Sequence, residues 1–154
     1  MFAIYQFFIS FILLISPLII LIRLFNGKED KNRFKEKFSI INHQPINGKT
    51  IWFHAASVGE IMSIISILKY YEKKREIKTI LVTTTTLSSA RIIKNLKFTK
   101  VIHQFYPIDH LIIVKKFLNH WKPKIAIFLE SEIWPAMFYA LNKKEIPLVL
   151  LNAR

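Results

Sequence analysis

The sequence predicts an α/β fold, a parallel sheet covered by helices on both faces and preceded by a membrane-anchor helix. Three observations support this: a long uncharged apolar stretch near the N-terminus, five short segments rich in β-branched and other apolar residues, and segments with helical spacing between them. Strands that alternate with helices of about 10 to 14 residues are typical of right-handed βαβ units. The 154 residues suffice for one such domain with its own core.

The first element is the apolar stretch over residues 2–22, which contains no charged side chain. About 20 apolar residues can cross a bilayer as a helix. A cleavable signal peptide would begin with basic residues and have a shorter apolar core, whereas here the positive charge follows the stretch. We therefore expect a transmembrane or membrane anchor over residues 1–24, with the rest of the chain on the cytoplasmic side. The alternative is a buried hydrophobic hairpin of a soluble protein.

Residues 25–49 are expected to form a basic juxtamembrane segment and linker. From residue 23 onward basic side chains outnumber acidic ones: Arg23, Lys28, Lys31, Arg33, Lys35 and Lys37 against Glu29, Asp30 and Glu36. Such a stretch is either a solvated helix face or a patch on anionic lipid, where each Lys or Arg adds about 1 kcal/mol. The neighbouring anchor favours the second interpretation.

The α/β domain is expected over residues 50–154. Segments rich in β-branched and other apolar residues predict strands over 50–55, 78–86, 100–106, 124–130 and 146–152. Apolar residues at helical spacing predict helices over 61–74, 88–97, 109–121 and 133–144. No helix follows the last strand, so we expect the chain to be a truncated form.

Composition and missing motifs exclude several functions. The sequence has no cysteine, which removes disulfides and thiolate metal sites. Neither dinucleotide binding nor a P-loop nucleotide site is supported, because neither glycine-rich motif occurs. The formal charge of +13 attracts polyanions. Nucleic-acid binding rests on that charge alone, because the aromatic residues do not interleave with a basic patch, and we expect no nucleic-acid partner.

Ligands of such a sheet gather at the carboxyl ends of its strands. The decapeptide IWFHAASVGE places Glu60 there, at the start of a helix. Ser57 and Glu60 have the spacing of a capping box, in which each residue satisfies a backbone N–H of the other. Gly59 favours a different role, because glycine allows a tight turn or the approach of a ligand. Glu60 is therefore either a helix cap or a general base.

The other candidates at this edge also have two readings. His54 is more simply a hydrogen-bonded strand-end histidine than a catalytic one. The threonines over 83–86 either reflect β-propensity or hold a phosphate or sugar beside a helix N-terminus. Glu130 and Glu132 suggest hydrogen bonding to backbone amides or sugar hydroxyls rather than metal binding, so no metal site is expected. Asp109 is most simply the start of a helix.

Several strings together resemble the 3-deoxy-D-manno-octulosonic acid (Kdo) transferases. These are IWFHAASVGE, LVTTTT, YPID, ESEIWP and LNAR, in this order, together with RFKEKF after the apolar stretch. The match extends over essentially all 154 residues but over only the first half of such an enzyme. The sequence departs from the family pattern at Leu87-Ser88-Ser89, where a turn with Pro or Gly is usual, and at Ser39, where Gly is common.

The resemblance implies the N-terminal, acceptor-binding domain of a GT-B glycosyltransferase, with a Rossmann-like fold, at the inner membrane. Such enzymes transfer Kdo from the donor CMP-Kdo to a lipid A precursor, with inversion and without a metal or other cofactor. The resemblance makes Glu60 the catalytic base. It assigns Ser57 and Gly59 to the turn that presents Glu60, and Glu130 and Glu132 to acceptor positioning or support of the base. Most of the donor site would lie in a C-terminal domain that is absent here.

Two other hypotheses stay open. The chain could be an inactive remnant or interaction module that binds lipid A precursor, or another membrane protein, without catalysis. It could also be a basic nucleic-acid-binding protein. The expected partners of the preferred reading are the lipid acceptor, CMP-Kdo and an anionic membrane surface.

Overall fold

The computed structural model describes residues 2–41, 43–44, 47–130 and 132–152. Five parallel strands form one sheet in the order β3-β2-β1-β4-β5. The strands are β1 Lys49–His54, β2 Ile77–Thr84, β3 Val101–Phe105, β4 Ile125–Leu129 and β5 Leu148–Leu151. The helices are α1 Phe2–Phe25, the 3₁₀ helix η1 Phe34–Phe38, α2 Val58–Glu72, α3 Leu87–Asn95, α4 Leu111–Trp121 and α5 Pro135–Lys143. The predicted α/β fold with a parallel, helix-covered sheet is confirmed.

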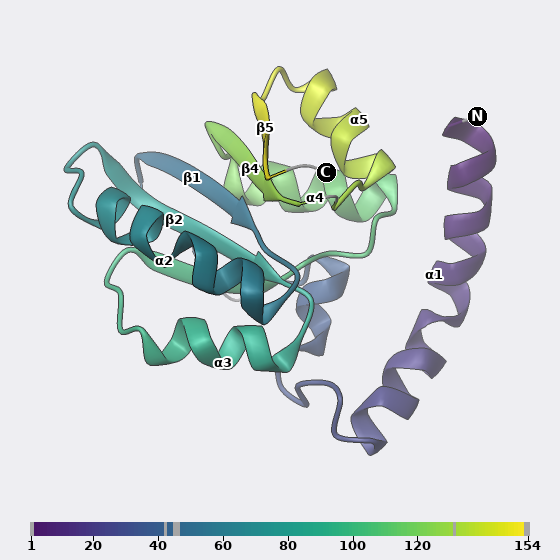
Figure 1. Ribbon diagram of the computed structural model, residues 1–154. Helices are drawn as coiled ribbons and strands as arrows, with labels where there is room; N and C mark the ends of the chain where they lie inside the picture. Colours follow the sequence, from purple (N-terminus) through teal and green to yellow (C-terminus); the bar gives the residue numbers. More distant parts are fainter. Residues whose placement is uncertain (1, 42, 45–46, 131, 153–154) are drawn as a thin grey trace.

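The strand order reverses beside β1. The chain moves outward from β1 through β2 to β3, then crosses back to β4 on the other side of β1 (Figure 1). In open α/β sheets, ligands bind outside the carboxyl ends of the strands at such a switch point. The segments that follow β1 and β4 are therefore the expected walls of a binding crevice.

Two hydrophobic clusters cover the two faces of the sheet. Side chains of β1 alternate between them, as the pleat requires: Trp52 packs with Phe117 of α4 and Met137 of α5, whereas Phe53 packs with Ile61 of α2. Helices α2 and α3 therefore cover one face, and α4 and α5 cover the other (Figure 1). This confirms that helices lie on both faces.

Helix α1 is long and apolar enough to cross a membrane, and it ends at Phe25, one residue beyond the predicted anchor. It lies beside the α/β domain (Figure 1), and only 11% of its most apolar window is buried. Phe2 and Tyr5 nevertheless pack against the core cluster of α4 and α5. The helix thus has an inner side that contacts the domain and a larger outer side that does not.

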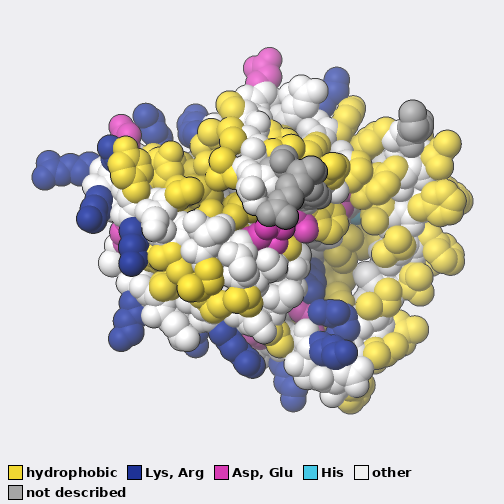
Figure 2. All heavy atoms as spheres, viewed as in Figure 1, with side chains coloured by type: hydrophobic (Ala, Val, Ile, Leu, Met, Phe, Trp, Pro, Cys, Tyr) yellow, Lys and Arg dark blue, Asp and Glu magenta, His cyan; other side chains and the backbone are white. Residues whose placement is uncertain are grey.

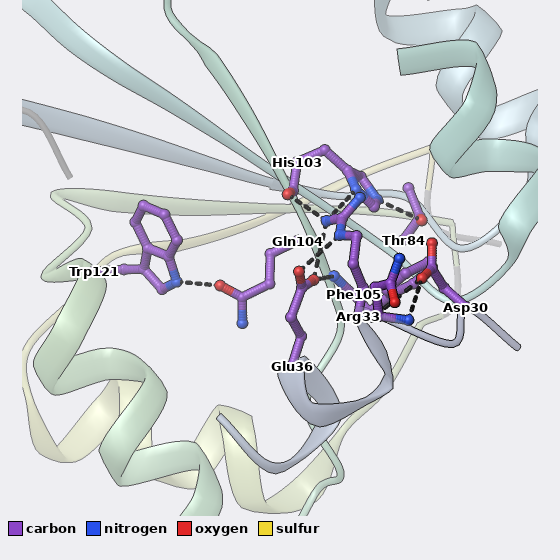
Figure 3. A network of polar contacts seen from close by, with 9 residues as sticks. Asp30, Arg33, Glu36, Thr84, His103, Gln104, Phe105 and Trp121 are labelled. Atoms are coloured by element: carbon purple, nitrogen blue, oxygen red, sulfur yellow. Dashed lines mark hydrogen bonds and ion pairs between the residues drawn. The ribbon is translucent and has the colours of Figure 1, made fainter. Parts of the chain in front are cut away.

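The segment after α1 is not a simple solvated face, because two of its acids are buried: Glu29 is 5% exposed and Glu36 is 4% exposed. Glu36 accepts hydrogen bonds from two guanidinium nitrogens of Arg33 (2.7 and 3.0 Å) and from the backbone N–H of Phe105 (2.9 Å). Arg33 also donates to the carbonyl of His103 (2.8 Å), as Figure 3 shows. Since β3 is an edge strand, these contacts cover an edge that would otherwise expose unpaired backbone groups.

Candidate functional site

Ser57 and Glu60 form the capping box at the start of α2. Ser57 Oγ accepts the backbone N–H of Glu60 (3.2 Å). The two carboxylate oxygens of Glu60 accept the N–H groups of Ser57 (3.1 Å) and Ala56 (2.9 Å). Glu60 is only 5% exposed, so its carboxylate is held in one position at the carboxyl end of β1. The capping interpretation is therefore confirmed, and the geometry leaves the catalytic one as a separate question.

Gly59 lies in the first turn of α2 and is exposed. It does not have a positive φ, and a Cβ placed there would have its nearest neighbour, Ser57 Oγ, at 3.9 Å. The backbone therefore does not need glycine at this position, contrary to the expected tight turn. What the missing side chain provides is open space beside Glu60.

The turn after β2 packs against the turn after β1. Thr85 Oγ1 and Ser89 Oγ both donate to the carbonyl of Ala56 (3.1 and 3.3 Å). Thr86 is the N-cap of α3, accepting the N–H of Ser89 (3.2 Å). Thr83 lies buried within β2. The threonines thus lie in turn in strand β2, in the turn that follows it and at the N-cap of α3. Their hydrogen bonds hold the loop that carries Glu60.

Glu132, in the segment after β4, faces the end of β1. Its Oε2 lies 3.5 Å from Nε2 of the fully buried His54 and accepts the indole N–H of Trp134 (3.0 Å). The hydrogen bond with His54 is the main reason that the pKa of the Glu132 carboxyl lies below its usual value, and burial opposes this effect. The Glu132 side chain stays 27% exposed, so an ionised carboxylate remains accessible at the switch point.

Aromatic rings surround His54. Its ring centroid lies 4.1 Å from that of Tyr106 and 6.4 Å from that of Trp134. His54 Nδ1 lies 3.0 Å from Thr83 Oγ1. His54 Nε2 has only the long 3.5 Å contact with Glu132, and the Tyr106 hydroxyl is buried without a hydrogen-bond partner among the described residues. Unpaired buried polar atoms are uncommon and often mark a site for water or a ligand. Sequence patterns assign Tyr106 no role, because its ring reaches His54 only once β3, β2 and β1 are assembled into one sheet.

Glu130 is exposed and has a positive φ of 53°. Among the residues that the structure describes, its carboxylate makes no hydrogen bond or ion pair, and neither Glu130 nor Glu132 is hydrogen-bonded to Glu60. The structure therefore joins Ser57 to Glu60, and Glu132 to His54, as two separate pairs. Ser131, Ala153 and Arg154 of the motifs at this edge lie outside the described residues.

Asp109 does not start the helix that follows it, because α4 begins at Leu111 with His110 as its N-cap. Its buried carboxylate accepts the backbone N–H groups of Ala136 and Met137 (both 2.9 Å). Asp109 thus caps α5, whose own N-cap residue Trp134 makes no side-chain cap hydrogen bond. Burial raises the pKa of the Asp109 carboxyl, and these hydrogen bonds oppose the rise.

No group of three or more His, Asp or Glu side chains within the described ranges could hold a metal ion. The chemistry available here is that of carboxylates, a histidine and aromatic rings at the end of a parallel sheet. That combination suits the recognition of a polar, hydroxyl-rich molecule, with one carboxylate free to accept a proton.

Comparison with known proteins gives a family. The family model described as 3-deoxy-D-manno-octulosonic-acid transferase (kdotransferase) matches residues 32–154. A 3-deoxy-D-manno-octulosonic acid transferase of Rickettsia bellii is 46% identical over 152 residues, and the match covers 96% of this chain and 35% of the relative. The protein with the same name in Haemophilus influenzae is 30% identical over 154 residues, covering 96% of this chain and 36% of the relative.

A more distant organism has a similar protein. The protein named "Probable 3-deoxy-D-manno-octulosonic acid transferase, mitochondrial" of Arabidopsis thaliana is 41% identical over 143 residues, covering 91% of this chain and 32% of the relative. The chain therefore spans about a third of the length of these relatives, and it corresponds to their N-terminal part. Since the family model matches most of its residues, the chain belongs to the 3-deoxy-D-manno-octulosonic acid transferase family.

Proposed function

We propose that this chain supplies the acceptor-binding part of a glycosyltransferase that moves Kdo from CMP-Kdo to a lipid A precursor at the cytoplasmic face of the inner membrane. Glu60 is the general base. It takes the proton of an acceptor sugar hydroxyl as that oxygen bonds to the anomeric carbon of Kdo. The bond from this carbon to the phosphate oxygen breaks, and CMP leaves with the electron pair. The donor is held mainly by the part of the relatives that this chain does not span.

The position of Glu60 is the single observation that carries this proposal. The carboxylate follows a central strand, beside the point where the strand order reverses, which is where ligands bind in such sheets. Two backbone amides fix its orientation. A carboxylate offers about four lone pairs, so each oxygen keeps one for an acceptor hydroxyl.

The approach to Glu60 lies across Gly59. Ser57, Val58 and Gly59 are all exposed, whereas Glu60 is not. The open space that replaces a side chain at Gly59 lets a sugar ring come close enough for a hydrogen bond of about 2.6–3.2 Å. In this proposal the glycine serves substrate access and not backbone geometry.

Glu132 positions the acceptor in the same crevice. It is more exposed than Glu60, and the contacts with His54 and Trp134 hold it in place. A carboxylate ordered in this way can accept hydrogen bonds from sugar hydroxyls, and charge-assisted bonds of this kind are about twice as strong as neutral ones. Glu130 has no such support among the described residues, so we expect it to contribute less than Glu132.

Transfer by a longer protein tests the proposal. Residues 1–154 followed by the remainder of the Rickettsia bellii relative would be incubated with CMP-Kdo and lipid A precursor in membranes. Loss of a general base costs about 10²- to 10⁴-fold in rate, so Glu60→Gln should lower kcat by at least that lower bound. Glu132→Gln should act mainly on KM for the acceptor.

The reverse pattern would reject the assignment of Glu60. If Glu60→Gln transfers Kdo at the wild-type rate while Glu132→Gln abolishes turnover, then Glu60 is only a helix cap and Glu132 is the base. If the wild-type fusion is folded and binds lipid A precursor but never transfers Kdo, this chain is a binding module without catalysis.

A further inference from the structure

The first end of α1 is bonded to the α/β domain. The hydroxyl of Tyr5 donates to Oδ2 of Asp109 (2.6 Å), which also caps α5. The backbone N–H of Leu111, at the start of α4, donates to the side-chain oxygen of Gln6 (3.1 Å). These polar atoms come from a helix that otherwise offers almost only apolar side chains.

Two further contacts extend this attachment. Ser10 Oγ lies 3.2 Å from Nε2 of His110, the N-cap residue of α4. The ring of Phe2 stacks on that of Tyr139 in α5, with centroids 4.4 Å apart. The first three turns of α1 are thus held against the N-terminal end of α4 and against α5.

The last turn of α1 is linked to the same domain through the segment that follows it. Arg23 Nε lies 3.0 Å from Oε2 of Glu29, and the same oxygen lies 2.6 Å from Nζ of Lys37 in η1. The 3₁₀ helix η1 is in turn bound to the edge strand β3 through Arg33 and Glu36 (Figure 3).

Both ends of α1 are therefore linked to the α/β domain, the first end directly and the last end through Glu29 and Lys37. A helix of 24 residues is about 36 Å long, which exceeds the roughly 30 Å of a bilayer's hydrocarbon core. If α1 crossed the bilayer, its ends would lie on opposite sides, and the contacts at one end would have to break. We propose that α1 does not cross the membrane but lies along its surface, with both ends on the side of the α/β domain.

The outer side of α1 is suited to lipid. Its large exposed side chains include Phe7, Phe8, Phe11, Leu14, Leu18 and Phe25, which are 58–84% exposed. Figure 2 shows hydrophobic side chains covering this side of the molecule. A surface-lying helix usually has a polar face of its own toward water. Here the domain takes that place, because the inner side of α1 packs on α4 and α5.

The occupant of this outer side is the lipid bilayer. Residues 2–22 contain no charged side chain, so neither an ion pair nor a charged hydrogen bond specifies a protein partner. The basic residues follow directly after the helix, where they meet anionic headgroups. This inference does not depend on the transfer reaction.

The lack of cysteine makes the topology measurable without background labelling. Ala3→Cys and Lys28→Cys place one thiol beside each end of α1, at exposed positions. A membrane-impermeant maleimide should label neither variant in intact spheroplasts and both in inverted inner-membrane vesicles. Labelling of Ala3→Cys from outside intact spheroplasts, with Lys28→Cys still protected, would mean that α1 spans the membrane and would overturn the proposal.

A second measurement identifies the occupant. Leu14→Cys carrying an environment-sensitive fluorophore should shift to the blue when the purified chain meets phosphatidylcholine–phosphatidylglycerol vesicles. Lys73→Cys, at an exposed position at the end of α2, should not shift. An unchanged spectrum at Leu14→Cys in the presence of vesicles would mean that protein, and not lipid, covers this face.

A groove of about 730 Å³ lies between the segment after α1 and helix α3. Its cationic lining includes Lys31, Arg91, Lys94 and Lys97, none of which has an ion pair among the described residues. Arg91 and Lys94 are three residues apart on α3, so they lie near one another, and Lys97 follows two residues after the last residue of this helix.

The acids that also line this groove are already paired. Glu29 binds Arg23 and Lys37, and Asp30 accepts the backbone N–H groups of Asn32 and Arg33 (2.9 and 3.0 Å). The groove therefore keeps an excess of positive charge. Because it begins at Gly27, two residues after α1, we infer that it binds the phosphate of a membrane lipid headgroup.

Matched charge removal tests this site. Each Lys or Arg near an anionic surface contributes about fivefold in affinity, so Arg91→Gln/Lys94→Gln/Lys97→Gln should weaken binding to phosphatidylglycerol vesicles by roughly a hundredfold. The control Arg75→Gln/Lys69→Gln/Lys73→Gln removes the same charges from exposed positions at the end of α2. An equal loss of affinity in both variants would mean that net charge alone governs binding, and it would overturn the proposed site. Competition by millimolar inorganic phosphate would show a free-phosphate site instead of a lipid one.

Discussion

At the scale of single residues, Glu60 shows how one local pattern can serve two purposes. The spacing of Ser57 and Glu60 predicts a capping box, and the structure contains one. The same spacing is silent about catalysis, which depends on what lies outside the helix. Ser57 and Glu60 could be placed from the sequence because the cap is a contact within four residues. The pair of His54 and Glu132 could not, because it joins two strand ends far apart in the chain.

Replacing Gly59 separates access from folding. Gly59→Ala has room for its Cβ and lies in a helical turn, so the free energy of unfolding should stay the same or rise by about 0.5–1 kcal/mol. We expect transfer by the longer protein to fall at least tenfold, because the methyl group fills the approach to Glu60. Thermal unfolding and initial rates measure the two effects. A variant with normal stability and normal rate would show that the acceptor does not pass Gly59.

At the scale of elements, strands and helices could be predicted because their periodicity is local. The residues at which these elements begin and end are visible only in the structure. The helix predicted from Asp109 begins two residues later, since the Asp109 carboxylate caps α5 instead. The basic segment after α1 was expected to lie on water or lipid, yet Glu29 and Glu36 are buried in it. Which loop caps which helix depends on tertiary packing, and no pattern within one segment reports it.

Asp109 should contribute to the free energy of unfolding through its cap on α5. Asp109→Asn replaces one acceptor oxygen by an NH₂ group that faces a backbone or hydroxyl donor, so we expect a loss of about 1–3 kcal/mol in the free energy of unfolding. Tyr5→Phe removes only one of the three hydrogen bonds to Asp109 and should cost less. Urea unfolding in mild detergent measures both. Equal stability of Asp109→Asn and wild type would contradict the role of this cap.

The buried His103 at the covered edge of β3 should make the free energy of unfolding decrease at acidic pH. His103 Nδ1 accepts from Arg33 and Nε2 donates to Thr84, which requires a neutral ring. Burial, and then the charge of Arg33, lower the pKa of His103 to about 3. The unfolded chain takes up this proton below about pH 6.5, so stability is full above that pH and falls as pH drops toward 3.

The slope should reach at most about 1.4 kcal/mol per pH unit. It is measured by urea unfolding between pH 7 and 4. His103→Gln should flatten this dependence, whereas His120→Gln, which lies outside the edge network, should keep it. An unchanged slope in His103→Gln would show that other groups govern the acid response.

At the scale of the whole molecule, the family could be recognised from the sequence because its motifs are strings of neighbouring residues. The strand order, with its reversal beside β1, and the attachment of both ends of α1 came only from the structure. An uncharged apolar stretch satisfies the length rule for a transmembrane helix whether it crosses a bilayer or lies on it. The chain corresponds to about a third of its relatives, so the transfer reaction has to be tested with the remainder supplied.

The most direct test of the catalytic claim compares Ser57→Ala with Glu60→Gln in the fusion with the Rickettsia bellii remainder. Each variant loses part of the same capping box, so each should lose about 1 kcal/mol of stability. Initial rates of Kdo transfer to lipid A precursor are then measured at a temperature where both variants are folded. We predict that Ser57→Ala keeps a rate within a few-fold of wild type, whereas Glu60→Gln loses at least a hundredfold. Equal rates in the two variants would contradict a proton transfer to Glu60.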